Sequence, residues 1–111
     1  MGYMCHHHIV VISFHEKDIK KAHARAKDKC GDVVTEILMT PVNGYRFFMV
    51  GPDGSKEGWS ASDKGDKSRE NFVDWLNNQA YKDGSNSFSW IYVKHAGEDH
   101  EVDPPEIISW G

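Results

Sequence analysis

The chain contains no long hydrophobic run. Its most apolar block, Ile9–Phe14, is far shorter than the roughly 18 to 20 residues that span a bilayer. The block is also too short for the core of a secretion signal, and histidines precede it where basic residues would be expected. Position 6 is His6 rather than Ser or Thr, so the myristoylation pattern that Gly2 would begin is not met. We therefore expect a cytoplasmic protein without a membrane segment.

Cysteine is also scarce, and acidic residues outnumber basic ones. Cys5 and Cys30 are the two cysteines among 111 residues, which is too few for a disulfide framework. Cys30 follows an apolar stripe and is typical of a small core residue. The formal net charge is -4, with 13 Lys and Arg against 17 Asp and Glu. Because nonspecific nucleic-acid binding depends on neutralising phosphates, this balance argues against a nucleic-acid partner.

The first third of the chain predicts a strand followed by a helix. His7–Phe14 has β-branched residues at consecutive positions, as in a strand that is buried on both faces. Ser13 and Glu16 have the spacing of a capping box, and Gly31 follows as a helix-ending glycine, so a helix is predicted from about His15 to Cys30. Its inner stripe consists mainly of small residues: Ile19, Ala22, Ala26 and Cys30.

The remainder predicts a hairpin, a second helix and a last strand. Val33–Thr40 and Tyr45–Val50 flank Asn43-Gly44, the strongest short-range hairpin signal. Apolar residues at helical spacing predict a helix over about Asp66–Tyr81, and Ser87–His95 predicts the last strand.

The order β-α-β-β-α-β is that of a ferredoxin-like sandwich, an α+β fold. In this fold a four-stranded antiparallel sheet carries two helices on one face. Right-handed crossovers place the first and third strands in the middle of the sheet. Residues 1–96 are predicted to form this single domain. Residues 97–111 are predicted to form an acidic C-terminal tail interrupted by prolines.

The sheet face that the helices leave open is the predicted binding surface. The last strand carries one alternating set with Ile91 and Val93 and a second set that is mainly aromatic. We expect the aliphatic set to face the helices and the aromatic set to lie on the open face. Large exposed apolar patches usually mark contact sites. The predicted binding residues are Tyr45, Phe47, Phe88, Trp90 and Tyr92.

Three kinds of covering are compatible with such a face. RNA is one, since RRM domains have this order and stack bases on strand aromatics, but Tyr45–Val50 lacks the glycine-interleaved signature of the third strand. A second copy of the chain is another, because symmetric dimers are the commonest oligomers. The third is the chain's own tail, with Ile107, Ile108 and Trp110, folding back over the sheet.

Few residues suggest chemistry. His6, His7 and His8 stand beside Cys5, and both residue types bind zinc, copper or nickel. Because side chains alternate along a strand, only His6 and His8 could share an ion, and no second ligand pair with metal-finger spacing follows; a solvated strand end or the remnant of a purification tag is the favoured explanation of the run. We therefore predict no metal and no cofactor. Trp59 follows a glycine-rich turn without Walker spacing, and either anchors that loop or forms an exposed contact.

One stretch carries a resemblance. Val42–Trp59, followed by Ser62–Asp66, resembles small uncharacterised proteins encoded by tailed bacteriophages. The resemblance covers roughly the middle third of the chain. It implies a phage accessory protein that acts inside a bacterium by binding a host or phage protein, and it transfers no activity and no site residues.

These features favour a non-enzymatic interaction protein. We expect a homodimer that binds a protein partner through its open sheet face or through the charged first helix, with Lys17, Lys20, Lys21, Arg25, Lys27 and Lys29. One alternative is a small enzyme of the dimeric α+β barrel type with a pocket over the sheet, for which the candidate residues are Tyr45, Trp90, Tyr92 and His95. Another is an RRM-like binder of single-stranded nucleic acid.

Overall fold

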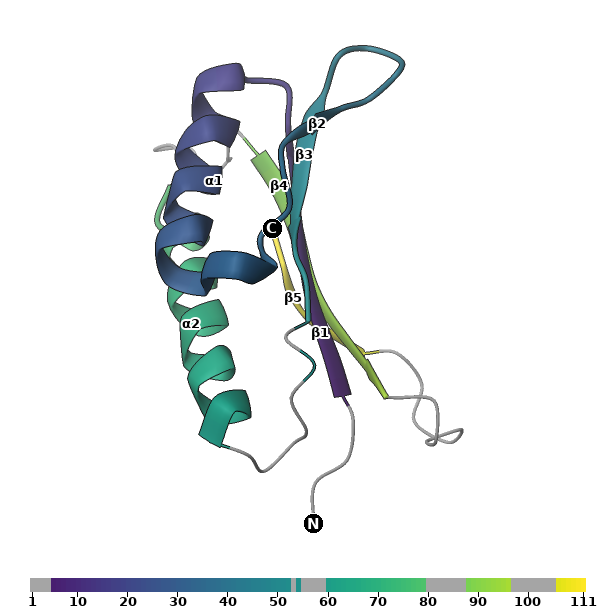
Figure 1. Ribbon diagram of the computed structural model, residues 1–111. Helices are drawn as coiled ribbons and strands as arrows, with labels where there is room; N and C mark the ends of the chain where they lie inside the picture. Colours follow the sequence, from purple (N-terminus) through teal and green to yellow (C-terminus); the bar gives the residue numbers. More distant parts are fainter. Residues whose placement is uncertain (1–4, 53, 55–59, 80–87, 97–105) are drawn as a thin grey trace.

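The computed structural model describes residues 5–52, 54, 60–79, 88–96 and 106–111. Two helices form one layer against one face of a five-stranded sheet (Figure 1). The elements are, in chain order, β1 (Cys5–Ser13), α1 (Glu16–Cys30), the 3-10 turn η1 (Gly31–Val33), β2 (Leu38–Met39), β3 (Arg46–Val50), α2 (Ser60–Asn77), β4 (Phe88–Ala96) and β5 (Glu106–Trp110). The predicted α+β class is confirmed. Neither α1 nor α2 in the described part is both long and apolar enough to cross a membrane.

The sheet has the order β2-β3-β1-β4-β5, and all its neighbouring strands are antiparallel. β1 lies in the middle, paired with β3 from Ile9↔Val50 to Ser13↔Arg46 and with β4 along its whole length. The central position predicted from the continuous apolarity of this strand is confirmed.

The predicted count of four strands is wrong. Residues of the expected C-terminal tail pair with β4 and add β5 at the edge of the sheet, with an irregular register between Tyr92 and Val93. Prolines argue against a strand in this region, but both of them precede the apolar segment that forms β5. The described part of the tail therefore extends the sheet sideways, and does not fold across its open face.

The predicted hairpin between β2 and β3 is present. A four-residue connection, residues 41–44, is closed by a hydrogen bond from the Thr40 N–H to the Tyr45 carbonyl at 2.7 Å, and Asn43 and Gly44 within it both have a φ of 65°. β2 is much shorter than predicted because Thr35 interrupts the regular ladder. Its backbone N–H donates to the Met49 carbonyl at 2.9 Å, but the Met49 N–H donates to the Thr35 side-chain oxygen instead of a carbonyl, also at 2.9 Å.

Both helices lie where the sequence predicted helices, with different starting points. α1 begins one residue after His15, and Ser13 accepts a hydrogen bond from the His15 N–H at 3.0 Å instead of forming the predicted capping box. Gly31 ends α1 with a φ of 64°, as predicted. α2 begins six residues earlier than expected, because the helix continues through Gly65.

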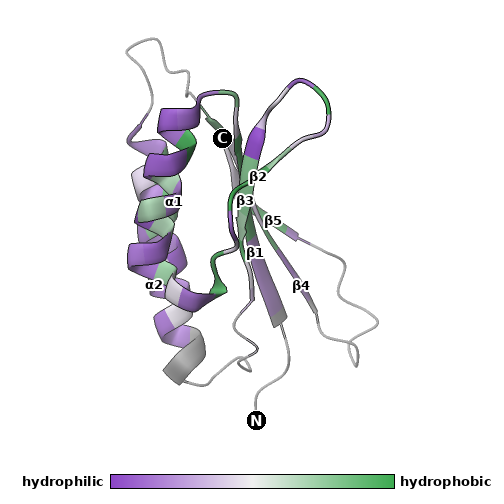
Figure 2. Ribbon diagram, turned by 45° about the horizontal axis from the view of Figure 1, so that its top comes forward, coloured by the Kyte–Doolittle hydropathy of each residue, from purple (hydrophilic) through white to green (hydrophobic). Residues whose placement is uncertain are grey.

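The hydrophobic core lies between the helices and the sheet. Figure 2 shows the inner sides of both helices carrying hydrophobic residues and their outer sides hydrophilic ones. Aromatic rings connect the layers: Phe72 lies 6.3 Å from both Phe48 and Trp75, and Trp75 stacks on Phe88 at 6.1 Å. The largest fully buried side chains are Phe48, Phe72, Ile9, Ile19, Leu76, Val11 and Val50.

Candidate functional site

The two faces of the sheet differ sharply in what covers them. Phe48 of β3 is fully buried against the helix layer, whereas its neighbour Phe47 points to the opposite face. In both ribbon views no described helix or strand lies over that second face (Figures 1 and 2). We call this second face the open face.

The predicted orientation of the last strand is wrong. Phe88, Trp90 and Tyr92 point to the helices and are only 4 to 5% exposed. The register agrees with this burial, since Trp90 pairs with the fully buried Val11. The aromatic set is the one that meets α2: Phe88 stacks on Trp75 of that helix at 6.1 Å, and the Tyr92 hydroxyl accepts a hydrogen bond from Arg69 Nε at 2.9 Å. These contacts bury the larger side chains of β4 on the helix side.

All five strands contribute apolar side chains to the open face. They are Leu38 from β2, Phe47 and Met49 from β3, Val10 and Ile12 from β1, Ile91 and Val93 from β4, and Ile107 and Trp110 from β5. A shallow hollow of about 180 Å³ lies among Val10, Ile12 and Ile91. None of the described strand residues on this face is Asp, Glu, Lys or Arg. The open face is therefore both apolar and uncharged.

Two of the five predicted binding residues lie on this side. Phe47 is half-buried within the open face, and Tyr45 is 40% exposed just before β3. Tyr45 meets the ring of Phe14 edge-on at 5.4 Å, and Phe14 is 59% exposed. The alternation along β1 could have predicted Phe14 as a neighbour of this patch. Trp59, the predicted loop contact, lies outside the described residues.

Histidines gather at one end of the open face. His6 is the cross-strand neighbour of His95, and their ring centroids are 5.2 Å apart. The Nε2 atoms of His8 and His95 are 2.9 Å apart, as in a hydrogen bond between the rings. Burial, and then the neighbouring His95, lowers the pKa of His8. Across the described residues, no group of three or more His, Cys, Asp and Glu side chains could hold a metal ion.

A buried polar network occupies the helix side of the sheet. Arg69 of α2 is 5% exposed, and its Nε donates to the Tyr92 hydroxyl at 2.9 Å. The same guanidinium donates to Asp66 one turn earlier, and His7 Nδ1 lies 2.9 Å from the Tyr92 hydroxyl. Burial raises the pKa of Tyr92, although Arg69 opposes the rise. The network connects α2 to β4 and β1 and satisfies a cation that would be costly to bury alone.

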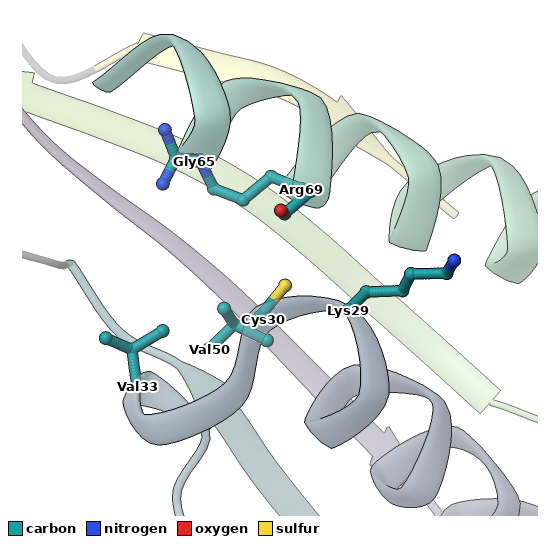
Figure 3. Close-up of a pocket in the computed structure, with 7 residues that line it drawn as sticks. Lys29, Cys30, Val33, Val50, Gly65 and Arg69 are labelled. Atoms are coloured by element: carbon teal, nitrogen blue, oxygen red, sulfur yellow. The ribbon is translucent and has the colours of Figure 1, made fainter. Parts of the chain in front are cut away.

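A small pocket of about 90 Å³ adjoins this network. Arg69 of α2 and Cys30, at the end of α1, flank the same space, with Val33 and Val50 beneath (Figure 3). Its volume corresponds to roughly three water molecules. Burial raises the pKa of the Cys30 thiol, with Arg69 opposing, so the thiolate needed for nucleophilic attack is disfavoured. We therefore interpret this pocket as part of the packing between the helices.

The open face is thus the strongest candidate site by area and composition, and the histidine cluster at its end is the one with metal-ligand chemistry. Comparison of the chain with protein-family models, with curated proteins and with solved structures finds no match.

Proposed function

We propose that this protein is a non-enzymatic interaction protein that forms a homodimer by packing two open faces against each other. The observation that carries the proposal is the uncharged, apolar composition of a face to which five strands contribute. A molecule with a net charge of -4 repels its own copies at most surfaces. On the open face this repulsion is weakest, and the apolar area gained on contact is largest.

The dimensions of the face suit a second copy. Four strands spaced about 4.8 Å apart cover about 19 Å, and with five to nine residues each they extend about 17 to 30 Å; the two-residue β2 adds to one edge. Such a face is of the same order as the roughly 800 Å² that each partner buries in a standard protein–protein interface. Two sheets packed in this way have an established geometry, with a spacing of about 10 Å.

The same composition weighs against the two alternatives. A nucleic-acid surface needs cations to neutralise phosphates, and the described strand residues of the open face contain no Lys or Arg. Of the residues considered for an α+β barrel enzyme, Trp90 and Tyr92 face the helices, so a pocket over the sheet would have only Tyr45 and His95.

The proposal also includes the fold family of the domain and a phage origin of the protein. We infer a ferredoxin-like arrangement extended by one edge strand, because β2-β3-β1-β4 follows the strand order expected for that family. The resemblance of Val42–Trp59 to phage-encoded proteins supports a role as a phage accessory protein that stays in the cytoplasm. A further protein partner, as that resemblance implies, would bind the dimer at a surface such as the charged α1.

Sedimentation equilibrium of the wild type and of Phe47→Glu tests the homodimer. A carboxylate at position 47, between Leu38 of β2 and Ile12 of β1 on the open face, leaves the helix-side core untouched but costs several kcal/mol if buried between two sheets. We expect a dimer for the wild type and a monomer with an unchanged circular dichroism spectrum for Phe47→Glu. The control Lys17→Glu, on the exposed side of α1, should remain a dimer. A wild type that stays monomeric up to millimolar concentration would overturn the proposal.

A further inference from the structure

Two imidazoles from distant parts of the chain converge at the end of the open face. His8 lies on β1 and His95 on β4, and the register of these central strands fixes both on the same side of the sheet. Their Nε2 atoms are 2.9 Å apart and their rings are nearly parallel, at 11°. His7, between the two other histidines of the run, points to the opposite face and contacts Tyr92 instead.

The separation of the two nitrogens matches that of neighbouring metal ligands. With metal–nitrogen bonds of about 2.0 to 2.1 Å, two nitrogens at right angles around an ion are roughly 2.9 Å apart. Two nitrogens in a tetrahedral site are roughly 3.4 Å apart by the same geometry. The observed distance therefore fits two adjacent positions of a tetragonal site, the geometry that Cu²⁺ and Ni²⁺ prefer with nitrogen ligands.

We propose that His8 and His95 together bind one divalent ion of the late first-row transition metals, with Cu²⁺ the tightest. Each ring then carries its hydrogen on Nδ1 and offers the Nε2 lone pair to the ion. The described residues provide these two ligands, and water occupies the remaining positions of the ion. The proposal is independent of the homodimer, because both ligands come from a single chain.

His95 distinguishes this site from a simple histidine run. An N-terminal stretch of histidines binds metals by itself, but it gains nothing from a residue 87 positions further along the chain. The site exists only in the folded sheet, where β1 and β4 are paired. Removal of His95 should therefore weaken metal binding as strongly as removal of His8, although the run itself stays complete.

Calorimetric titration with Cu²⁺ and with Zn²⁺ tests the proposal, using full-length chains that carry Cys5→Ser so that no thiolate beside the histidines competes for the ion. The variants are His8→Gln and His95→Gln, which keep a polar side chain of similar size. His15→Gln is the matched control, because His15 is an exposed histidine at the start of α1 without a side-chain cap bond. Circular dichroism establishes that each variant is folded.

We expect one Cu²⁺ per chain, bound more tightly than Zn²⁺, and at least about tenfold weaker binding in either cluster variant. Electron paramagnetic resonance of the Cu²⁺ complex should show coupling to two imidazole nitrogens in the parent chain and in the His15→Gln control. Unchanged affinity and unchanged nitrogen coupling in folded His95→Gln would overturn the proposal and assign the ion to the N-terminal run alone.

Discussion

The helix-covered face and the open face of this sheet are built from the same strands, yet they have different chemistry. The covered face holds large aromatics and a buried cation, Arg69, whose donors go to Tyr92 and Asp66. The open face carries aliphatic residues, Phe47 and a group of histidines, without a charged strand residue in the described part. Both faces carry mainly apolar side chains, but the helices pack against only one of them. Hydrophobicity alone did not decide which face became the core.

The largest expected difference in the free energy of unfolding is between alanine variants of two neighbouring phenylalanines of β3, Phe48 and Phe47. Phe48→Ala empties a fully buried position between the sheet and Phe72, and should lower the free energy of unfolding by about 3 to 5 kcal/mol. Phe47→Ala, one residue away on the open face, should cost less than about 1.5 kcal/mol in the isolated chain. Urea denaturation at low protein concentration measures both. Equal losses would contradict the distinction between the two faces.

An intermediate difference in the free energy of unfolding is expected between phenylalanine variants of Tyr92 and Tyr45. Tyr92→Phe removes the acceptor of the buried Arg69 Nε and leaves that donor without a partner, at a cost of about 1 to 3 kcal/mol. Tyr45→Phe, on the exposed side, should change the free energy of unfolding by less than about 0.5 kcal/mol. Chemical denaturation of the two variants side by side gives the comparison. If Tyr92→Phe proves neutral, the buried network contributes nothing to stability.

Alkaline pH should lower the free energy of unfolding through two groups on the helix-covered side of the sheet, Cys30 and Tyr92. Burial raises the pKa of both Cys30 and Tyr92, so each group holds its proton longer in the folded chain than in the unfolded one. The unfolded chain therefore loses these protons first, and the contribution to stability declines as pH rises above about 9 for the thiol and about 10 for the phenol. Thermal denaturation as a function of pH should show a shallower decline in Tyr92→Phe than in Tyr45→Phe. Identical profiles would rule out Tyr92 as a source of the decline.

The smallest expected effect is a difference in the alkylation rates of two cysteines, which does not depend on a change in the stability of the fold. In a chain with Cys5→Ser, Cys30 should react with iodoacetamide several-fold more slowly than a cysteine placed on the exposed side of α1 by Lys17→Cys. Mass spectrometry of tryptic peptides from the double variant measures both rates in one sample. In denaturant the two cysteines should react alike. A Cys30 that reacts as fast as the introduced cysteine in the folded chain would contradict its burial.

The sequence predicts the central elements of the fold well, because each of their residue patterns is typical of only one local structure. Consecutive β-branched residues indicated a central strand, and β1 is central; the expected burial on both faces is not seen, since Val10 and Ile12 are half-buried on the open face. The turn that contains Asn43-Gly44 and the end of α1 at Gly31 could be predicted because both need a positive φ, which few residues adopt. The start of the second helix was predicted six residues too late, because a helix tolerates an internal glycine such as Gly65 at a cost of about 1 kcal/mol.

The orientation of β4 could not be derived from its own residues, since both of its alternating sets are apolar. The deciding information lies in α2, where Trp75 stacks on Phe88 and Arg69 donates a hydrogen bond to the Tyr92 hydroxyl. The histidine pair was equally hidden: the spacing of His6 and His8 is visible in the sequence, but their proximity to His95 depends on the register of β1 against β4. Residues that meet only through strand pairing leave no local signal.

The position of β1 also has a consequence for the order of folding. This strand is the first element of the chain, and its longest partner, β4, is among the last. At translation rates of about 5 to 20 residues per second, residues 5–13 wait roughly 4 to 17 s for residues 88–96 to be synthesised. Such long-range pairing slows folding, and until β4 is made one edge of this apolar strand lacks its partner. The chain is therefore most prone to misassociation while it is being made.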